Sequence, residues 1–156
     1  MAVLKSDISL FLIDAFENSD DVINELSARA RDKGFVDETF AGNVINRERE
    51  YPTGLPTGVP IAIPHIHEGC LESFFAMALP VKPVPFFNMG DSNEQLMAEM
   101  VFLFGITDPG EQTAVLKKFA KTFQHTETLK DFQNSASPEE IAEKVRAVFG
   151  DFIRIG

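Results

Sequence analysis

The ten residues 97–106, Met-Ala-Glu-Met-Val-Phe-Leu-Phe-Gly-Ile, form an almost entirely apolar run. Such a run is typical of a β-strand that is buried on both faces. Shorter apolar runs at Val59–Ile63 and Ser73–Pro80 predict two further strands. A sheet built around a strand of this kind needs cover on both faces, so helices must pack against each side of it.

Several segments repeat their apolar residues at helical spacing and carry recognisable end signals. Asn18 and Asp37 are the expected caps of the first two helices, Gly34 ends the first, and Ser137 followed by Pro138 starts the last. We expect helices at about 20–33, 37–48, 111–123, 127–133 and 138–149. Residues 8–16 are expected to open the sheet, and residues 81–91 to form an irregular strand and turn at the surface. The alternation of strands and helices predicts an α/β fold, with a central mixed β-sheet flanked by helices on both faces.

Composition narrows the class of protein. The 156 residues, 44% of them hydrophobic and 15 of them phenylalanine, suit one domain spanning residues 1–156. A net charge of −10 repels phosphates and anionic lipids, which argues against nucleic acid or a membrane surface as a direct ligand. No window reaches the roughly 18 to 20 apolar residues of a membrane span, and the start of the chain lacks the pattern of a signal peptide. With Cys70 as the single cysteine, a cytoplasmic location is expected.

The most specific pattern lies in residues 47–65. Arg47-Glu48 is followed after three residues by Pro52-Thr53-Gly54, and Ile61-Ala62-Ile63-Pro64 then leads to His65. An apolar strand that stops at a proline holds the imidazole on rigid backbone at a surface edge, where a partner can reach it. Taken alone, a histidine at a strand end also fits a hydrogen-bonded scaffold residue.

With these residues in this order, the sequence resembles the enzyme IIA components of the bacterial phosphotransferase system (PTS) for sugar uptake, in the fructose and mannitol class (EIIA type-2). It is most similar to the galactitol-type branch. The resemblance implies that His65 accepts a phosphoryl group from the phosphocarrier protein HPr. His65 would then pass the group to an enzyme IIB, for uptake of a galactitol-like sugar or polyol through the membrane component IIC. It also implies that no metal or nucleotide cofactor takes part.

The resemblance also assigns the surrounding residues. Arg47 is expected at the phosphoryl oxygens, with Thr53 as a weaker candidate, because phosphoryl transfer depends on positioning and charge stabilisation. Many members of the class have a second histidine where this chain has Gln112, which can donate a hydrogen bond but cannot titrate. Without the family pattern, a solvated charge at a helix end is the favoured interpretation of Arg47. For Gln112, an exposed polar residue in the first turn of a helix is an equally good interpretation.

Other interpretations use the same segment. His67 lies two residues after His65, so in a continued strand both rings would point the same way, and Glu68 or Cys70 could complete a metal site. Pro64 argues against that continuation, and His67 then either flanks the active site or only caps the next segment. A regulatory enzyme IIA relative would keep phosphorylation of His65 without a transport role. A hydrolase with His65 as general base lacks an evident nucleophile in the motif.

Overall fold

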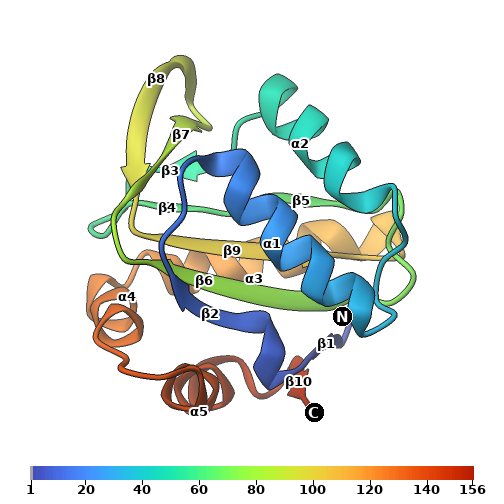
Figure 1. Cartoon of the computed structure of the whole chain (residues 1–156). Helices are drawn as coiled ribbons and strands as arrows, with labels where there is room; N and C mark the ends of the chain where they lie inside the picture. The colour runs from blue at the N-terminus through green and yellow to red at the C-terminus, as the bar shows by residue number, and fades with distance from the viewer. Residues whose placement is uncertain (1) are drawn as a thin grey trace.

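A computed structural model describes residues 2–156, and it confirms the expected fold class (Figure 1). Ten strands form one mixed sheet in the order β10-β1-β6-β9-β4-β3-β7-β8, with β2 also beside β6 and β5 also beside β9. The central strands β6 and β9 are antiparallel, whereas β4 and β5 run parallel to β9. The strands are β1 (Leu4–Ser6), β2 (Phe11–Asp14), β3 (Gly54–Leu55), β4 (Ile61–Ala62), β5 (His65–Ile66), β6 (Phe74–Pro80), β7 (Val84–Asn88), β8 (Asp91–Ala98), β9 (Met100–Gly105) and β10 (Ile153–Ile155).

The helices lie close to their expected positions. They are α1 (Ser19–Asp32), α2 (Phe40–Glu50), α3 (Gln112–Phe123), α4 (Thr126–Gln133) and α5 (Pro138–Phe149), with short 3-10 helices η1 (Ile8–Leu10) and η2 (Pro109–Glu111). Figure 1 shows α1 in front of the sheet and α3 behind it. The side chains of Asn18 and Ser137 accept capping hydrogen bonds from Asp21 and Glu140, as predicted. Gly34 follows α1 with φ 77°, the left-handed conformation that favours glycine there. Within residues 2–156, no helix is long and apolar enough to cross a membrane.

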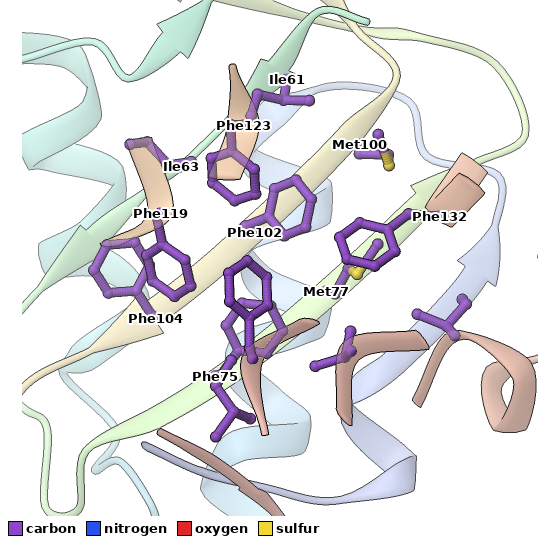
Figure 2. Close-up of a cluster of buried hydrophobic side chains, with 14 of the residues drawn as sticks. Ile61, Ile63, Phe75, Met77, Met100, Phe102, Phe104, Phe119, Phe123 and Phe132 are labelled. Carbon is purple, nitrogen blue, oxygen red and sulfur yellow. The ribbon is translucent and has the colours of Figure 1, made fainter. Parts of the chain in front are cut away.

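The sheet separates two apolar clusters, because successive side chains of a strand point to opposite faces. Phe75 of β6 and Phe102 of β9 belong to the cluster that includes α3, α4 and α5, whereas Ala76 and Val101 pack with α1 and α2. Figure 2 shows the first cluster, in which phenylalanine rings from β6, β9, α3 and α4 lie against one another. Burial of each such ring contributes about 1.5–3 kcal/mol. This phenylalanine-rich layer is the rigid support beneath β9.

The prediction of a single strand at residues 97–106 is wrong. The chain bends at Glu99, so that Met97 and Ala98 end β8 at the sheet edge while β9 begins at Met100 in the sheet centre. The Glu99 backbone N–H donates to Pro60, and its carboxylate accepts from Gln133 at 2.6 Å. Continuous hydrophobicity hid this change of position, because both halves of the run are partly or wholly buried. Residues 84–98 form a hairpin of β7 and β8, more regular than the surface turn expected at 81–91.

Smaller differences concern element ends. Asp37 does not cap α2 directly; its carboxylate accepts from the backbone N–H and hydroxyl of Thr39, in the turn before the helix. Residues 8–16 divide into η1 and β2. The strand expected at Val59–Ile63 becomes β4 and, after Pro64, β5. The three-residue strands β1 and β10, which pair in parallel, were too short to predict.

Candidate active site

His65 projects from the first residue of β5 onto the phenylalanine-rich face of the sheet. Ile61 and Ile63 belong to that cluster, and the two-residue period of an extended chain carries the next side chain in the series, His65, to the same side. In the register of β5 and β9, His65 lies opposite Phe104. The two rings are stacked, with centroids 4.8 Å apart and planes 8° from parallel. The imidazole is 7% exposed, so it lies on a rigid aromatic surface with a small open edge.

One hydrogen bond fixes the tautomer of the neutral ring. His65 Nδ1 lies 2.7 Å from the carbonyl oxygen of Ile63. Because a carbonyl oxygen only accepts, Nδ1 carries the hydrogen. The lone pair of the neutral imidazole is therefore on Nε2.

The surroundings of His65 favour this neutral form. Burial lowers the pKa of His65 below its usual value of 6.5. The hydrogen bond to Ile63 acts in the opposite direction, and the positive charge of Arg47 lowers the pKa further. Near neutral pH the neutral form of the ring, with its lone pair on Nε2, is therefore favoured.

The His65 ring lines a surface cavity of about 230 Å³, to which separate parts of the chain contribute. Arg47 comes from the last turn of α2, and its guanidinium lies 5.1 Å above the Tyr51 ring. Gln112 is the first residue of α3, which covers the phenylalanine-rich face. The complete lining is Arg47, Tyr51, Pro52, Thr53, His65, Met89, Gln112 and Leu116. The fold therefore brings together four residues expected from the sequence, Arg47, Thr53, His65 and Gln112.

Thr53 lies in the site but is engaged by a residue to which the sequence analysis gave no role. Its hydroxyl donates to Glu48 Oε1 at 2.7 Å, and its backbone N–H donates to Glu48 Oε2 at 2.8 Å. The threonine is 3% exposed. Burial raises the pKa of Glu48 to about 7, although both hydrogen bonds from Thr53 act to lower it. The signal for Glu48 was present, since it stands beside Arg47 in the motif, five residues before Thr53.

His67 and Cys70 lie outside this cavity. The chain turns after β5, and His67 is exposed, with Nδ1 3.5 Å from Glu68 Oε2. The Cys70 thiol donates to the Glu72 carbonyl at 3.0 Å, and burial raises its pKa to about 12. Between residues 2 and 156, no three His, Cys, Asp or Glu side chains gather in a way that could hold a metal ion.

The mixed sheet between two helical layers matches the fold of solved IIA proteins of the phosphotransferase system. Residues 5–147 match the family described as "Phosphoenolpyruvate-dependent sugar phosphotransferase system, EIIA 2", and the chain belongs to this family. Domains of this family are phosphoryl-transfer components of that system.

Solved structures agree with this assignment at the level of the fold. The mannitol-specific cryptic phosphotransferase enzyme IIA CmtB from Escherichia coli has a TM-score of 0.72 at 14% identity, covering 90% of this chain and 94% of that one. The nitrogen regulatory protein IIA-Ntr from Neisseria meningitidis has a TM-score of 0.68 at 20% identity, with coverage of 88% and 94%. The complex of enzyme IIA-Mtl with phosphorylated enzyme IIB-Mtl from E. coli gives a TM-score of 0.66 at 16% identity, with coverage of 86% and 94%. No curated protein matches the chain in sequence.

Proposed function

We propose that this protein is a cytoplasmic phosphocarrier in which His65 accepts a phosphoryl group from HPr and passes it to an enzyme IIB. The observation that carries the proposal is the state of the His65 ring. Its Nδ1 is occupied by the Ile63 carbonyl, its Nε2 has the free lone pair, and the ring borders a small cavity next to Arg47. These are the requirements for a nucleophile that must hold a phosphoryl group briefly and release it.

In the proposed step, the Nε2 lone pair attacks phosphorus on the donor phosphohistidine. The new P–Nε2 bond forms as the donor's P–N bond breaks, and the donor nitrogen recovers its lone pair. The guanidinium of Arg47 stabilises the charge on the three phosphoryl oxygens, and the Gln112 amide offers a further hydrogen bond. The Nδ1 hydrogen bond to Ile63 keeps the ring in the attacking orientation through both transfers. Transfer to IIB is the same exchange with His65 as the donor.

The proposed partner IIB is supported by the fold shared with IIA-Mtl, whose complex with phosphorylated IIB-Mtl is known. A galactitol-like substrate for the pathway rests on the Arg-Glu…Pro-Thr-Gly…Ile-Ala-Ile-Pro-His pattern and on Gln112 in the place of a second histidine. A regulatory role is the second candidate, because IIA-Ntr shares the fold equally well. In that case His65 would still be phosphorylated, but no sugar-specific IIB would accept the group.

The phosphorylation step is tested by incubating the protein with phosphoenolpyruvate, enzyme I and HPr, followed by intact mass measurement. We expect one acid-labile phosphoryl group per chain. His65→Ala should accept none, and His67→Ala is the matched control that should accept one. Phosphorylation of His65→Ala would overturn the assignment.

The partner is tested with the phosphorylated protein and a panel of purified IIB proteins for galactitol, mannitol and fructose. Rapid transfer to the galactitol-type IIB, with slower transfer to the others, is the expected result. Phosphorylation of His65 without transfer to any of them would favour the regulatory role.

A further inference from the structure

Glu48 is a carboxylate that the proposed chemistry leaves without a role. It lies on α2 directly after Arg47, and residues of a helix that are adjacent in sequence point about 100° apart. Arg47 lines the His65 cavity, whereas Glu48 turns beneath the following loop. Both of its oxygens are taken by one residue, Thr53, through the hydroxyl and the backbone N–H.

These two hydrogen bonds begin a chain of contacts that ends at the His65 ring. The Thr53 carbonyl accepts from the Ile63 N–H at 3.3 Å. The Ile63 carbonyl then accepts from His65 Nδ1 at 2.7 Å. The contacts range from 2.7 to 3.3 Å, and Thr53, Ile63 and His65 are all buried. Glu48 is therefore connected to the His65 ring through two buried residues, Thr53 and Ile63.

The segment between Thr53 and Ile63 needs such an anchor. It contains Pro56, Gly58 and Pro60, and its regular structure is limited to the two-residue strands β3 and β4, which pair with each other and with β7 and β9. Strands this short hold little register by themselves. An anchor at Thr53 fixes the carbonyl of Ile63, and with it the tilt of the imidazole and the direction of Nε2.

Position matters more than strength in this chemistry. A displacement of about 1 Å at a reacting group can reduce a rate by about 10²-fold. Burial of the Glu48 carboxylate carries a free-energy cost. The raised pKa of Glu48, about 7, reflects that cost.

We propose that Glu48 is a positioning residue for phosphoryl transfer, which holds His65 in its attacking orientation through Thr53 and Ile63. This inference rests on the proposed function of His65. Glu48 does not touch the phosphoryl group; it determines where the ring is when the group arrives. Its place beside Arg47 means that one turn of α2 supplies both the charge for the phosphoryl oxygens and the anchor for the nucleophile.

The first test compares Glu48→Ala with Glu48→Gln in single-turnover transfer from phosphorylated HPr. Glutamine can accept the Thr53 N–H through its carbonyl and donate its amide N–H to the Thr53 hydroxyl, so it can keep both contacts. We expect Glu48→Ala to lower the maximal transfer rate about 10- to 100-fold, with little change in the HPr concentration at half-maximal rate. Glu48→Gln should recover the rate to within about threefold.

The charge-matched control is Glu50→Ala on the same helix, where the side chain is exposed. It should transfer within about twofold of the unaltered protein. If Glu48→Ala fails to fold, Thr53→Val takes its place, because it removes the hydroxyl bond alone. A normal rate for a folded Glu48→Ala, or for Thr53→Val in that case, would overturn the inference.

The second test observes the ring without any transfer. In ¹⁵N NMR spectra of unphosphorylated protein, His65 should show a protonated Nδ1 and an unprotonated Nε2. Glu48→Ala should lose this single-tautomer signature, and Glu48→Gln should restore it. If ring signals and rate are both unchanged in Glu48→Ala while His65→Ala accepts no phosphoryl group, the inference fails and the proposed function stands. If the unaltered protein accepts no phosphoryl group, the proposed function fails, and the ring signals alone then decide whether Glu48 orients His65.

Discussion

His65 and His67 are only two residues apart in sequence, but they differ in strand pairing, in ring contacts and in exposure. His65 belongs to a strand that is paired with β9, its ring is stacked on Phe104, and it is buried. His67 follows the last paired residue of β5; its exposed ring lies 3.5 Å from Glu68, and its carbonyl accepts from the Cys70 N–H. The sheet, not the residue type, gives one histidine a fixed tautomer and a cavity.

The two arginines of α2 repeat this contrast. Arg47 lines the cavity and lies over Tyr51, whereas Arg49 is exposed and pairs with Asp20 at 3.0 Å. A spacing of two residues on a helix places side chains on different faces. In both pairs, one residue lines the His65 cavity and the other lies exposed on the surface.

The largest effect expected from this contrast is that of Arg47→Ala on phosphoryl transfer. Loss of one charged donor at the transferring group should lower the transfer rate about 100- to 1,000-fold. Rapid-quench measurement with phosphorylated HPr gives the rate, and Arg49→Ala is the matched control, expected within about twofold. Equal effects of the two substitutions would remove the distinction between the arginines.

A smaller effect is expected when the surface under His65 is altered. Phe104→Leu should lower the free energy of unfolding by about 1–2 kcal/mol and slow transfer about tenfold, because the imidazole loses the ring on which it is stacked. The control is Phe123→Leu, which changes a ring of the same cluster that stacks with Phe119. It should lose similar stability, measured by urea unfolding, without slower transfer. A slow Phe123→Leu would mean that general softening of the core, rather than the ring under His65, limits the rate.

The next effect is on pH dependence. A histidine with a pKa of about 6.5 is about one quarter neutral at pH 6.0. Because burial lowers the pKa of His65, a larger fraction should remain neutral at that pH, and NMR titration of the ring measures it. The same shift makes the free energy of unfolding fall as pH drops through 6.5. In this range the His65 ring binds a proton in the unfolded chain more readily than in the folded protein. A ring pKa of 6.5 or above would contradict the burial argument.

The smallest effect is that of His67→Ala. The side chain is exposed and its contact with Glu68 is long, at 3.5 Å. Transfer should stay within about twofold, and the free energy of unfolding within about 0.5 kcal/mol. Transfer slowed tenfold would show that the turn after β5 belongs to the site, and the distinction between the two histidines would be lost.

The sequence predicted the parts of this molecule that depend on local signals. Helix caps at Asn18 and Ser137, the stop at Gly34 and the strand that leads to His65 all follow from neighbouring residues. The bend at Glu99 did not, because the apolar pattern continues across it while the chain moves from the sheet edge to the sheet centre.

The site divides in the same way. His65, Arg47 and Gln112 were indicated by a motif and a resemblance, and the cavity brings them together. The stacking of His65 on Phe104 depends on the register of two strands that are distant in sequence, and no local pattern reports it. Glu48 and Thr53 both stand in the sequence motif, but nothing in the sequence indicates that they form hydrogen bonds with each other.

The pairing of β1 with β10 determines when the sheet can be completed during synthesis of the chain. Leu4–Ser6 lies beside Ile153–Ile155, so one edge of β1 has no partner until residues 153–155 have left the ribosome. During synthesis that edge is an open row of backbone donors and acceptors, available to other nascent chains. Deletion of residues 153–156 would make this temporary exposure permanent, and aggregation of the shortened chain would then begin at β1, far from the deleted residues in sequence.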